Sequence, residues 1–378
     1  MFHSGAMSDN ARAKLPLSLP TSLPSGLHAR GRGAGSNACG RFEATRREVF
    51  DDGWDLTLEA RVLRTEVRQE TPRSALRRNT SPDIAFDRSI NPYRGCEHGC
   101  IYCFARPTHA YLNLSPGLDF ETRLIARPGL GAVLERELRK PGYSAAPVAI
   151  GTNTDPYQPI EAEYRVMREL LEVLAAFRHP VTIVTKGALI ERDLDLLAPM
   201  AAQGLLHVGI SITTLDDGLS RKLEPRAPRP ARRLQVIARL AEAGVPVRVM
   251  VAPVVPGLTD AETEAILTAA RDAGARAASW IMLRLPREVS ALFRDWLATH
   301  YPDRAARVMG RVRDLHGGQD YDPQWGQRMR GQGVWADLAA QRFDRATRRL
   351  GLDGKLAPLR RDLFAPPPRP GDQLSLGL

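Results

Sequence analysis

Short apolar segments alternate with helical patterns through most of this 378-residue chain, and this alternation is the feature that most constrains its fold. The apolar segments are rich in β-branched residues, as strands are, and they lie at 84–90, 147–152, 181–185, 205–213, 246–252 and 279–285. Helical periodicity follows the last five, at 162–177, 192–202, 231–243, 260–273 and 289–300. Six strands with helices between them predict an α/β protein with a parallel sheet, rolled into a partial or full (β/α) barrel.

The barrel pattern does not extend over the whole chain. Residues 1–45 are rich in Ser, Pro, Gly, Ala and Arg without periodicity, which predicts a disordered basic arm. The barrel core is expected over 80–300. A helical extension is expected over 301–364, with helices at 303–315 and 335–350, and the Pro-rich residues 365–378 are expected to form a disordered tail.

Composition limits the function classes. The chain shows neither an apolar run long enough to span a bilayer nor a signal peptide, so it is expected in the cytoplasm. The net charge is +10, but the basic excess lies mainly in residues 1–50 and 301–378. A nearly neutral body argues against a nucleic-acid channel through the barrel, although the flanks remain able to contact phosphate.

Three of the four cysteines, Cys96, Cys100 and Cys103, lie within eight residues in the pattern C-x3-C-x2-C. Such clustering favours a metal site over disulfides. Three thiolates suit three corners of a four-iron, four-sulfur cubane and leave the fourth iron open to a small molecule. The alternative is a zinc site completed by His98 or His109. Gly95 and Gly99 are expected to give the loop its positive φ angles. Cys39 lies far from this cluster and is expected to be a free thiol.

Polar residues follow several of the predicted strands, where ligands bind in parallel α/β folds. They are Asn153, Thr154, Asp155, Lys186, Ser211 and Thr213. Asp155 has the charge to meet an ammonium group, but Asp-Pro also favours a turn. The hydroxyls of Ser211 and Thr213 face the same way and suit a ribose, unless they only bond to the backbone. Lys186 is one of only five lysines, which favours a specific role for it over an ordinary surface position.

The segment NPYRGCEHGCIYCFA, with Tyr102 as the aromatic residue before the third cysteine, resembles the radical S-adenosylmethionine (SAM) superfamily. Residues 80–300 and the N-terminal RGRGAGSN and GRFE are similar to its spore-photoproduct-lyase-like group. The resemblance implies a partial (β/α)6 barrel. It also implies a [4Fe-4S] cluster on the three cysteines that cleaves SAM reductively to a 5′-deoxyadenosyl radical, which takes hydrogen from a substrate. Such an enzyme needs an electron donor such as a flavodoxin or a ferredoxin.

The resemblance also implies which residues contact the cofactor: Tyr102, Asn153, Thr154, Asp155, Lys186, Ser211, Thr213 and Glu224. The Lys186 ammonium is expected to pair with the SAM carboxylate. Glu224 lies in the family-like LEP element, and Pro253 lies in a VAP element expected to line the adenine. The chain departs from the pattern in two places. It lacks the Gly-Gly-Glu motif after the second strand, and it has no cysteine after Cys103, where photoproduct repair uses a hydrogen donor.

Three other hypotheses remain open. The first is nucleic-acid modification or DNA repair of the photoproduct-lyase type, which the basic flanks would support. The second is a zinc-stabilised nucleic-acid-binding protein without catalysis. The third is an electron-transfer or scaffold protein that keeps the cluster but does not bind SAM.

Overall fold

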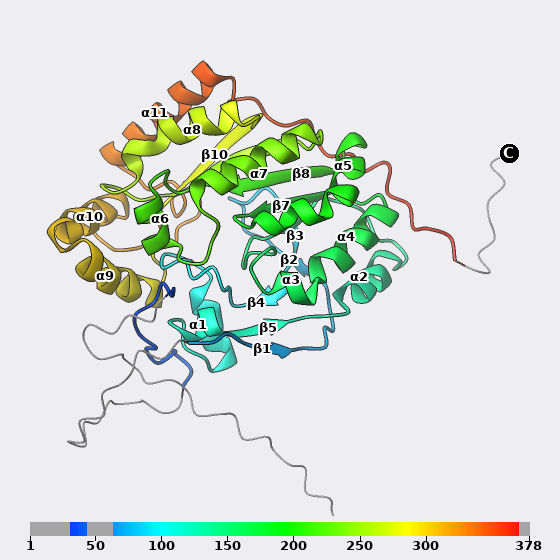
Figure 1. The fold of residues 1–378 in the computed structure, drawn as a ribbon, viewed down its shortest axis with the longest axis horizontal. Helices are drawn as coiled ribbons and strands as arrows, with labels where there is room; N and C mark the ends of the chain where they lie inside the picture. The colour runs from blue at the N-terminus through cyan, green and yellow to red at the C-terminus, as the bar shows by residue number, and fades with distance from the viewer. Residues whose placement is uncertain (1–30, 44–62, 370–378) are drawn as a thin grey trace, which may run out of the picture.

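The computed structural model describes residues 31–43 and 63–369. Its main sheet has the strand order β10-β9-β8-β7-β6-β3-β2 (Figure 1). The strands are β2 (Leu76–Arg78), β3 (Arg88–Ile90), β6 (Val148–Ile150), β7 (Val181–Thr185), β8 (Leu206–Ser211), β9 (Val247–Val254) and β10 (Ala277–Met282). All neighbours are parallel except β2, which is antiparallel to β3. Six parallel strands in chain order form an open, partial (β/α)6 barrel, and the predicted fold class is confirmed.

The helices between the strands lie close to their predicted positions, except α2 and α6, which were not predicted. They are α2 (Leu130–Leu138), α3 (Glu161–Tyr164), α4 (Val166–Ala176), α5 (Leu194–Ala202), α6 (Asp217–Leu223), α7 (Pro230–Glu242) and α8 (Thr263–Asp272), with short 3-10 turns at η2 (Ala188–Asp193) and η3 (Asp260–Glu262). Their buried Leu, Ile and Val side chains pack on the sheet in one continuous core. This burial of one apolar face per helix explains why the periodicity in the sequence was informative.

Two predicted elements differ from the structure. The strand expected at 84–90 is only Arg88–Ile90 long, because the preceding residues form a turn closed by a bond from Asn79 N–H to the Asp87 carbonyl (2.7 Å). The helix expected at 162–177 is two helices, because Arg165 adopts a left-handed conformation (φ 51°) between α3 and α4. Neither feature changes the hydrophobic pattern from which the elements were predicted.

A second, three-stranded sheet was not predicted. It has the order β1-β5-β4, formed by β1 (Glu66–Gln69), β5 (Arg123–Ala126) and β4 (Tyr93–Arg94). The 3-10 helix η1 (Arg106–Leu112) and the one-turn helix α1 (Asp119–Thr122) lie between its strands. These elements are too short to show periodicity, and together they support the loop that carries the three cysteines.

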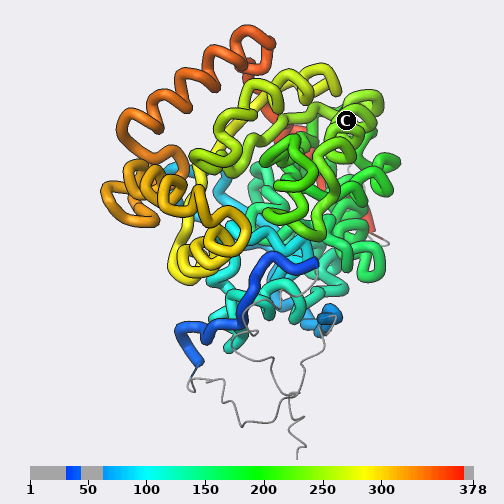
Figure 2. The backbone as a smooth tube through the Cα atoms, turned by 60° about the vertical axis from the view of Figure 1, so that its left-hand side comes forward, coloured from blue at the N-terminus to red at the C-terminus, as the bar shows by residue number. Residues whose placement is uncertain are grey.

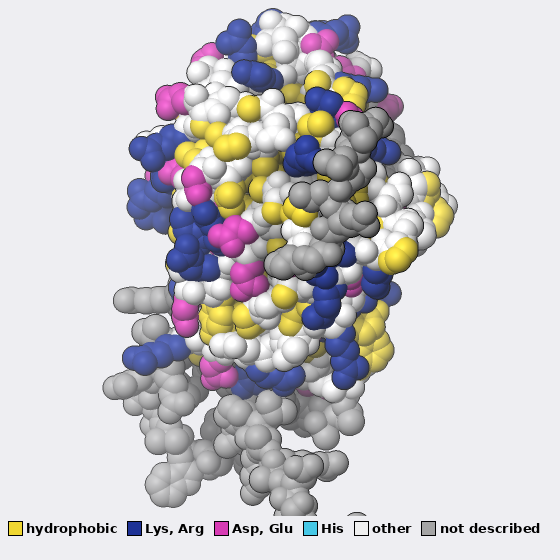
Figure 3. All heavy atoms as spheres, turned by 90° about the vertical axis from the view of Figure 1, so that its right-hand side faces the viewer, with side chains coloured by type: hydrophobic (Ala, Val, Ile, Leu, Met, Phe, Trp, Pro, Cys, Tyr) yellow, Lys and Arg dark blue, Asp and Glu magenta, His cyan; other side chains and the backbone are white. Residues whose placement is uncertain are grey.

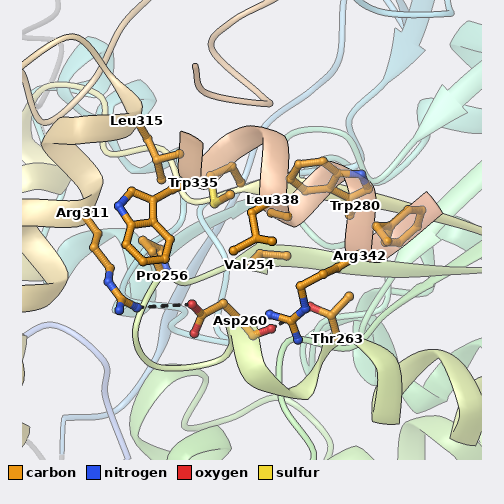
Figure 4. Close-up of a pocket in the computed structure, with 13 residues that line it drawn as sticks. Val254, Pro256, Asp260, Thr263, Trp280, Arg311, Leu315, Trp335, Leu338 and Arg342 are labelled. Carbon is orange, nitrogen blue, oxygen red and sulfur yellow. Dashed lines mark hydrogen bonds and ion pairs between the residues drawn. The ribbon is translucent and has the colours of Figure 1, made fainter. Parts of the chain in front are cut away.

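The predicted C-terminal helices are present as α10 (Pro302–Leu315) and α11 (Val334–Leu350), after α9 (Glu288–His300). A small pocket of about 70 Å³ lies where α11 crosses α8, α10 and the ends of β9 and β10 (Figure 4). Trp335 and Leu338 of α11 lie over it, and Arg311 pairs with Asp260 at its edge (3.5 Å). Of the predicted tail, residues 370–378 lie outside the described residues.

No helix among the described residues is long and apolar enough to cross a membrane. On the face at the right-hand side of Figure 1, Lys and Arg side chains are interspersed with Asp and Glu (Figure 3). This face therefore does not form the continuous basic surface that a nucleic acid would favour.

Candidate functional site

The cysteine loop, residues 95–105, leaves the end of β4 and brings the three cysteines into one turn-rich segment. Cys96 and Cys100 are buried and Cys103 is half-buried, and all three are free thiols. Gly95 and Gly99 have φ angles of 75° and 68°, so the expectation of positive φ at both positions is confirmed. Only glycine adopts this conformation without strain.

The cysteine loop is fixed at both sides by backbone hydrogen bonds. The Cys96 N–H donates to the Phe120 carbonyl of α1 (2.9 Å), and the Ile101 N–H donates to the Leu223 carbonyl at the end of α6 (3.0 Å). The loop is therefore held between α1, outside the barrel, and α6, which follows β8. This places the cysteines at the carboxyl ends of the barrel strands, where the sequence predicted the site.

Arg106 fixes the backbone of the cysteine loop through hydrogen bonds. Its guanidinium is fully buried and donates to the carbonyl oxygens of Cys100 (3.0 Å) and Gly99 (3.1 Å), and it pairs with the buried carboxylate of Glu121. Because these carbonyls are bound to Arg106, they cannot turn toward the thiols. Neither residue was predicted from the sequence, because an Arg and a Glu fifteen residues apart give no recognisable signal.

The N-terminal strap, residues 31–43, packs against this assembly (Figure 2). The backbone N–H groups of Gly33 and Ala34 each donate to the Glu121 carboxylate (2.9 Å), and the Asn37 side chain exchanges hydrogen bonds with Asp119. The predicted disorder of residues 1–45 does not hold for 31–43, because buried carboxylates far along the chain satisfy the strap's backbone. Residues 1–30 and 44–45 lie outside the described residues.

The strap lies tightly against the cysteine loop at Gly33. A Cβ atom on Gly33 would lie 1.9 Å from the Gly99 carbonyl oxygen. Glycine is therefore required for the strap to lie against the loop. Cys39, on the same strap, is partly exposed and unpaired, as expected.

Burial and one nearby cation set the pKa values of the Cys96 and Cys100 thiols. Burial raises the pKa of Cys96, and it raises that of Cys100 to about 12, although the Lys186 ammonium partly opposes this second shift. Coordination requires deprotonated sulfur, so iron would displace protons that these thiols otherwise keep. Three soft ligands on one loop, with an ammonium group beside Cys100, fit an iron–sulfur cluster whose overall charge is negative.

The two histidines that could complete a zinc site each have a polar neighbour, and the Nδ1 atom of each is buried without a hydrogen-bond partner in the described part of the chain. His98 Nδ1 lies 3.3 Å from an Asp155 oxygen, and His109 Nε2 is 2.9 Å from the Arg123 carbonyl oxygen. Within residues 31–43 and 63–369, no three Cys, His, Asp or Glu side chains converge on a point where a single ion would lie.

Glu224 is the centre of a buried polar network beside Cys100. Its carboxylate accepts hydrogen bonds from Tyr102 and from Thr213 (2.7 Å) and pairs with the buried Arg233, and the Lys186 ammonium is 4.0 Å away. Burial acts to raise the pKa of Glu224, but Arg233 and Lys186 hold it down at about 2. Four of the predicted cofactor residues, Tyr102, Lys186, Thr213 and Glu224, are thus brought together.

Lys186 is mostly buried, at 16% side-chain exposure. Burial favours its neutral form, but the neighbouring Cys100 and Glu224 outweigh this and raise its pKa. Its ammonium lies 5.8 Å from the centre of the Tyr102 ring. A charged amine is therefore fixed at the end of β7, next to the cysteine loop, where it can bind a carboxylate.

Asp155 is an ionised carboxylate whose oxygens already have partners. Burial acts to raise its pKa, but His98, Thr185 and the Lys186 N–H lower it to about 2. Its side chain accepts from the Thr185 hydroxyl (2.6 Å), the Lys186 N–H (2.7 Å) and the Tyr157 N–H (2.9 Å). The structure thus shows Asp155 in the turn-forming role, joining the loops that follow β6 and β7.

The other predicted residues face the backbone or make no bond. Ser211 donates to the Ala252 carbonyl (3.0 Å) and Thr154 to the Tyr93 carbonyl (2.9 Å). The Asn153 side chain makes no hydrogen bond within the described residues, which leaves its amide available near the site. In the VAP element, Val249 and Val251 are core residues of β9, and Pro253 lies near its end.

Gln158 is a further residue that the sequence analysis missed. Its side-chain oxygen accepts from the Glu97 N–H (2.8 Å) and its nitrogen donates to the Gly95 carbonyl (3.1 Å). The fully buried amide thus fastens the cysteine loop to the loop after β6. No local pattern distinguishes a glutamine in this role from one on the surface.

The fold is thus an open (β/α)6 barrel with a three-cysteine loop at the carboxyl ends of its strands. The sequence model of the Radical SAM superfamily matches residues 90–270, and this chain belongs to that superfamily. An uncharacterized protein of Mycobacterium tuberculosis is 40% identical over 242 residues, which is 64% of this chain and 70% of the relative. An uncharacterized protein of Methanocaldococcus jannaschii is 27% identical over 46% of this chain and 62% of the relative.

Among solved structures, a spore photoproduct lyase complexed with dinucleoside spore photoproduct has a TM-score of 0.51. The likeness covers 75% of this chain and 78% of the lyase chain at 16% sequence identity. At this identity the likeness concerns the fold. It agrees with the partial barrel and with the sequence resemblance.

Proposed function

We propose that this protein is a radical SAM enzyme in which Cys96, Cys100 and Cys103 hold a [4Fe-4S] cluster. When bound, the cluster and SAM together supply a 5′-deoxyadenosyl radical that takes hydrogen from the substrate. The observation that carries the proposal is the three-thiol loop beside the buried Lys186 and Glu224. It offers three soft ligands to a four-iron cluster.

The protein's own residues have distinct roles in this proposal. The cysteine thiolates bind iron, and Arg106 keeps the loop carbonyls away from it. The Lys186 ammonium binds the SAM carboxylate. Glu224 fixes the Tyr102 and Thr213 hydroxyls, so that the wall beside the cofactor is rigid before it binds. The electron is proposed to come from a flavodoxin or a ferredoxin.

The direct test is anaerobic reconstitution with iron and sulfide, followed by dithionite and SAM. We expect a brown protein with about four irons per chain that releases 5′-deoxyadenosine. Cys100→Ala should reduce iron and sulfide to background, because two thiolates do not hold the cubane, while the matched Cys39→Ser should keep both. Colourless protein containing one zinc would support the zinc-stabilised binding module, and a cluster without SAM binding would support the electron-transfer alternative.

The substrate can be found by deuterium transfer into 5′-deoxyadenosine from labelled candidates. DNA photoproduct repair is one candidate, supported by the likeness to the lyase fold. The absence of a cysteine after Cys103 argues against it, because that chemistry uses a downstream thiol as hydrogen donor. A thymine-dimer oligonucleotide that transfers deuterium would support repair, and one that does not would leave other hydrogen donors to be screened.

A further inference from the structure

A second cavity, of about 360 Å³, lies beside the cysteine loop and outside the network around Glu224. Its wall combines the backbone of the N-terminal strap, the end of α6 and the C-terminal half of α9. Pro225 separates it from the loop, since a Cβ atom on Gly99 would lie 3.3 Å from the Pro225 ring. The lining includes Arg32, Gly33, Arg221, Lys222, Asp295 and Trp296. None of the residues proposed to bind the cluster or SAM lines this cavity.

Arg221 and Lys222 differ from the arginines that follow them in the chain. Each of the later ones is paired with a carboxylate: Arg226 with Glu97, Arg229 with Asp217, Arg232 with Glu191 and Arg233 with Glu224. Arg221 and Lys222 are exposed on the cavity wall, and within the described residues neither pairs with a carboxylate. Lys222 is held over the Tyr301 ring at 4.6 Å. The two cations of residues 221–233 that have no carboxylate partner are therefore those that line the cavity.

Arg32 adds a third positive charge from the opposite wall. It is 8% exposed and donates to the carbonyls of Glu121 (2.8 Å) and Leu63 (2.7 Å), while its Nε has no partner. These carbonyls and the Thr65 hydroxyl (3.0 Å) fix its position, and the carboxylates of Glu121 and Glu97 lie close enough to act on its charge. Among the side chains that line the cavity, the only carboxylate is Asp295, whose pKa is raised by burial, and the two cations without a nearby carboxylate are Arg221 and Lys222. The cavity thus has a surplus of positive charge.

We propose that this cavity binds a phosphorylated small molecule. A phosphate group carries a charge of about −1.5 to −2 at neutral pH, which matches the surplus. The Arg221 guanidinium can bind it with two parallel hydrogen bonds, and Lys222 can bind it as a point charge. The cavity volume lies within the usual range for small-molecule sites. Trp296 and Pro225 provide an apolar wall for the rest of the ligand.

The site is connected to the cysteine loop through the strap. Arg32 and Gly33 line the cavity, and the same two residues contact Glu121 and the Gly99 carbonyl. A ligand that orders this wall therefore also restrains the loop that holds the cluster. We expect binding to slow amide hydrogen exchange in residues 31–43 and 95–103.

The test is calorimetric titration of the full-length protein with inorganic pyrophosphate and with ADP, which separates recognition of the phosphates from recognition of a whole nucleotide. We expect at least one probe to bind, and Arg221→Ala/Lys222→Ala to weaken it at least tenfold. The matched control is Arg345→Ala/Arg349→Ala, two exposed arginines on α11, which should leave the affinity unchanged. Neither measurement requires the cluster, so the result is independent of the proposed enzyme activity.

A second variant separates the cavity from general surface charge. Thr299→Trp fills the cavity from α9 without removing a cation and should also abolish binding. Failure of both probes to bind, an equal effect of the α11 control, or unchanged binding in Thr299→Trp would each overturn the proposal.

Discussion

At the scale of single residues, Lys186 is distinguished by its surroundings. Most lysines extend their ammonium into water, but this one is held between Cys100, Glu224 and the Tyr102 ring. Glu224 already balances one positive charge with Arg233. The Lys186 ammonium therefore keeps the capacity to bind a second carboxylate, which in the proposed function belongs to SAM.

We predict that Lys186→Ala weakens SAM binding at least tenfold and leaves the cluster intact. A charge-assisted hydrogen bond in a buried site contributes more than about 1.4 kcal/mol, the free energy of a tenfold change. Equilibrium dialysis with reconstituted protein measures the affinity, and iron content checks the cluster. Lys140→Ala, on an exposed lysine, is the control. An unchanged affinity in Lys186→Ala would remove the residue from the cofactor site.

Glu224 contributes to stability as well as to the site. We predict that Glu224→Gln lowers the free energy of unfolding by about 3–5 kcal/mol, because it leaves the buried Arg233 without its counter-charge. Urea denaturation measures the loss. Glu264→Gln breaks the half-exposed pair with Arg342 (2.6 Å) and should cost less than about 1 kcal/mol. Equal losses in the two variants would contradict the importance assigned to burial.

At the scale of elements, the N-terminal strap and the cysteine loop form one unit. They are more than fifty residues apart in sequence, yet they share Glu121 and touch at Gly33 and Gly99. The small sheet behind them has strands of at most four residues, which are not stable alone. Each of these pieces therefore depends on the others for its order.

We predict that Gly33→Ala releases the strap, because its Cβ has no space beside the Gly99 carbonyl. Overpacking of this kind costs about 1–3 kcal/mol, and it should increase trypsin cleavage after Arg32 and Arg41. In contrast, Gly310→Ala places a methyl group in open space within α10 and should be neutral or stabilising. If Gly33→Ala resists trypsin as well as the natural chain does, contacts other than the one at Gly33 hold the strap in place.

At the scale of the whole molecule, the last described segment closes the end of the barrel opposite the site. The Arg360 N–H donates to the Gly204 carbonyl (2.9 Å) and the Ala365 N–H to the Phe177 carbonyl (3.1 Å). Phe364 packs edge-on against the His179 ring at 5.5 Å. His179 Nδ1 lies 2.9 Å from the Pro180 carbonyl and its Nε2 lies 2.8 Å from the Tyr143 hydroxyl. Neutral imidazole satisfies both contacts, as donor and as acceptor.

We predict that His179 makes the protein less stable in mild acid. Burial lowers its pKa from 6.5 to about 4, so the folded state disfavours the proton. The contribution of neutral His179 to the free energy of unfolding is complete above pH 6.5. It is lost as the pH falls from 6.5 through 4, and the loss is at most about 3 kcal/mol. Urea denaturation across this range should show a shallower decline for His179→Gln. Parallel declines would assign the pH dependence to other groups, such as His109.

The sequence alone determined the positions of the barrel strands and the identity of the three thiols, because both are encoded locally. Apolar periodicity within a strand or helix, and three cysteines within eight residues, need no distant partner to be recognised. It also placed Lys186 and Thr213 near one another, since the carboxyl ends of parallel strands converge, while Tyr102 and Glu224 were assigned to the same site by the family resemblance. The split at Arg165 and the shortened β3 were missed because they leave the hydrophobic pattern unchanged.

Only the tertiary structure decided how the cysteine loop is held. Arg106, Glu121, Gln158 and the strap act through contacts between residues that are distant in sequence, and each looks ordinary in its own neighbourhood. The same holds for the order of residues 31–43. Their composition predicts disorder, but in the folded protein buried carboxylates accept hydrogen bonds from their backbone. It holds also for Arg221 and Lys222. Only the structure shows that they lack carboxylate partners while the later arginines of residues 221–233 are all paired.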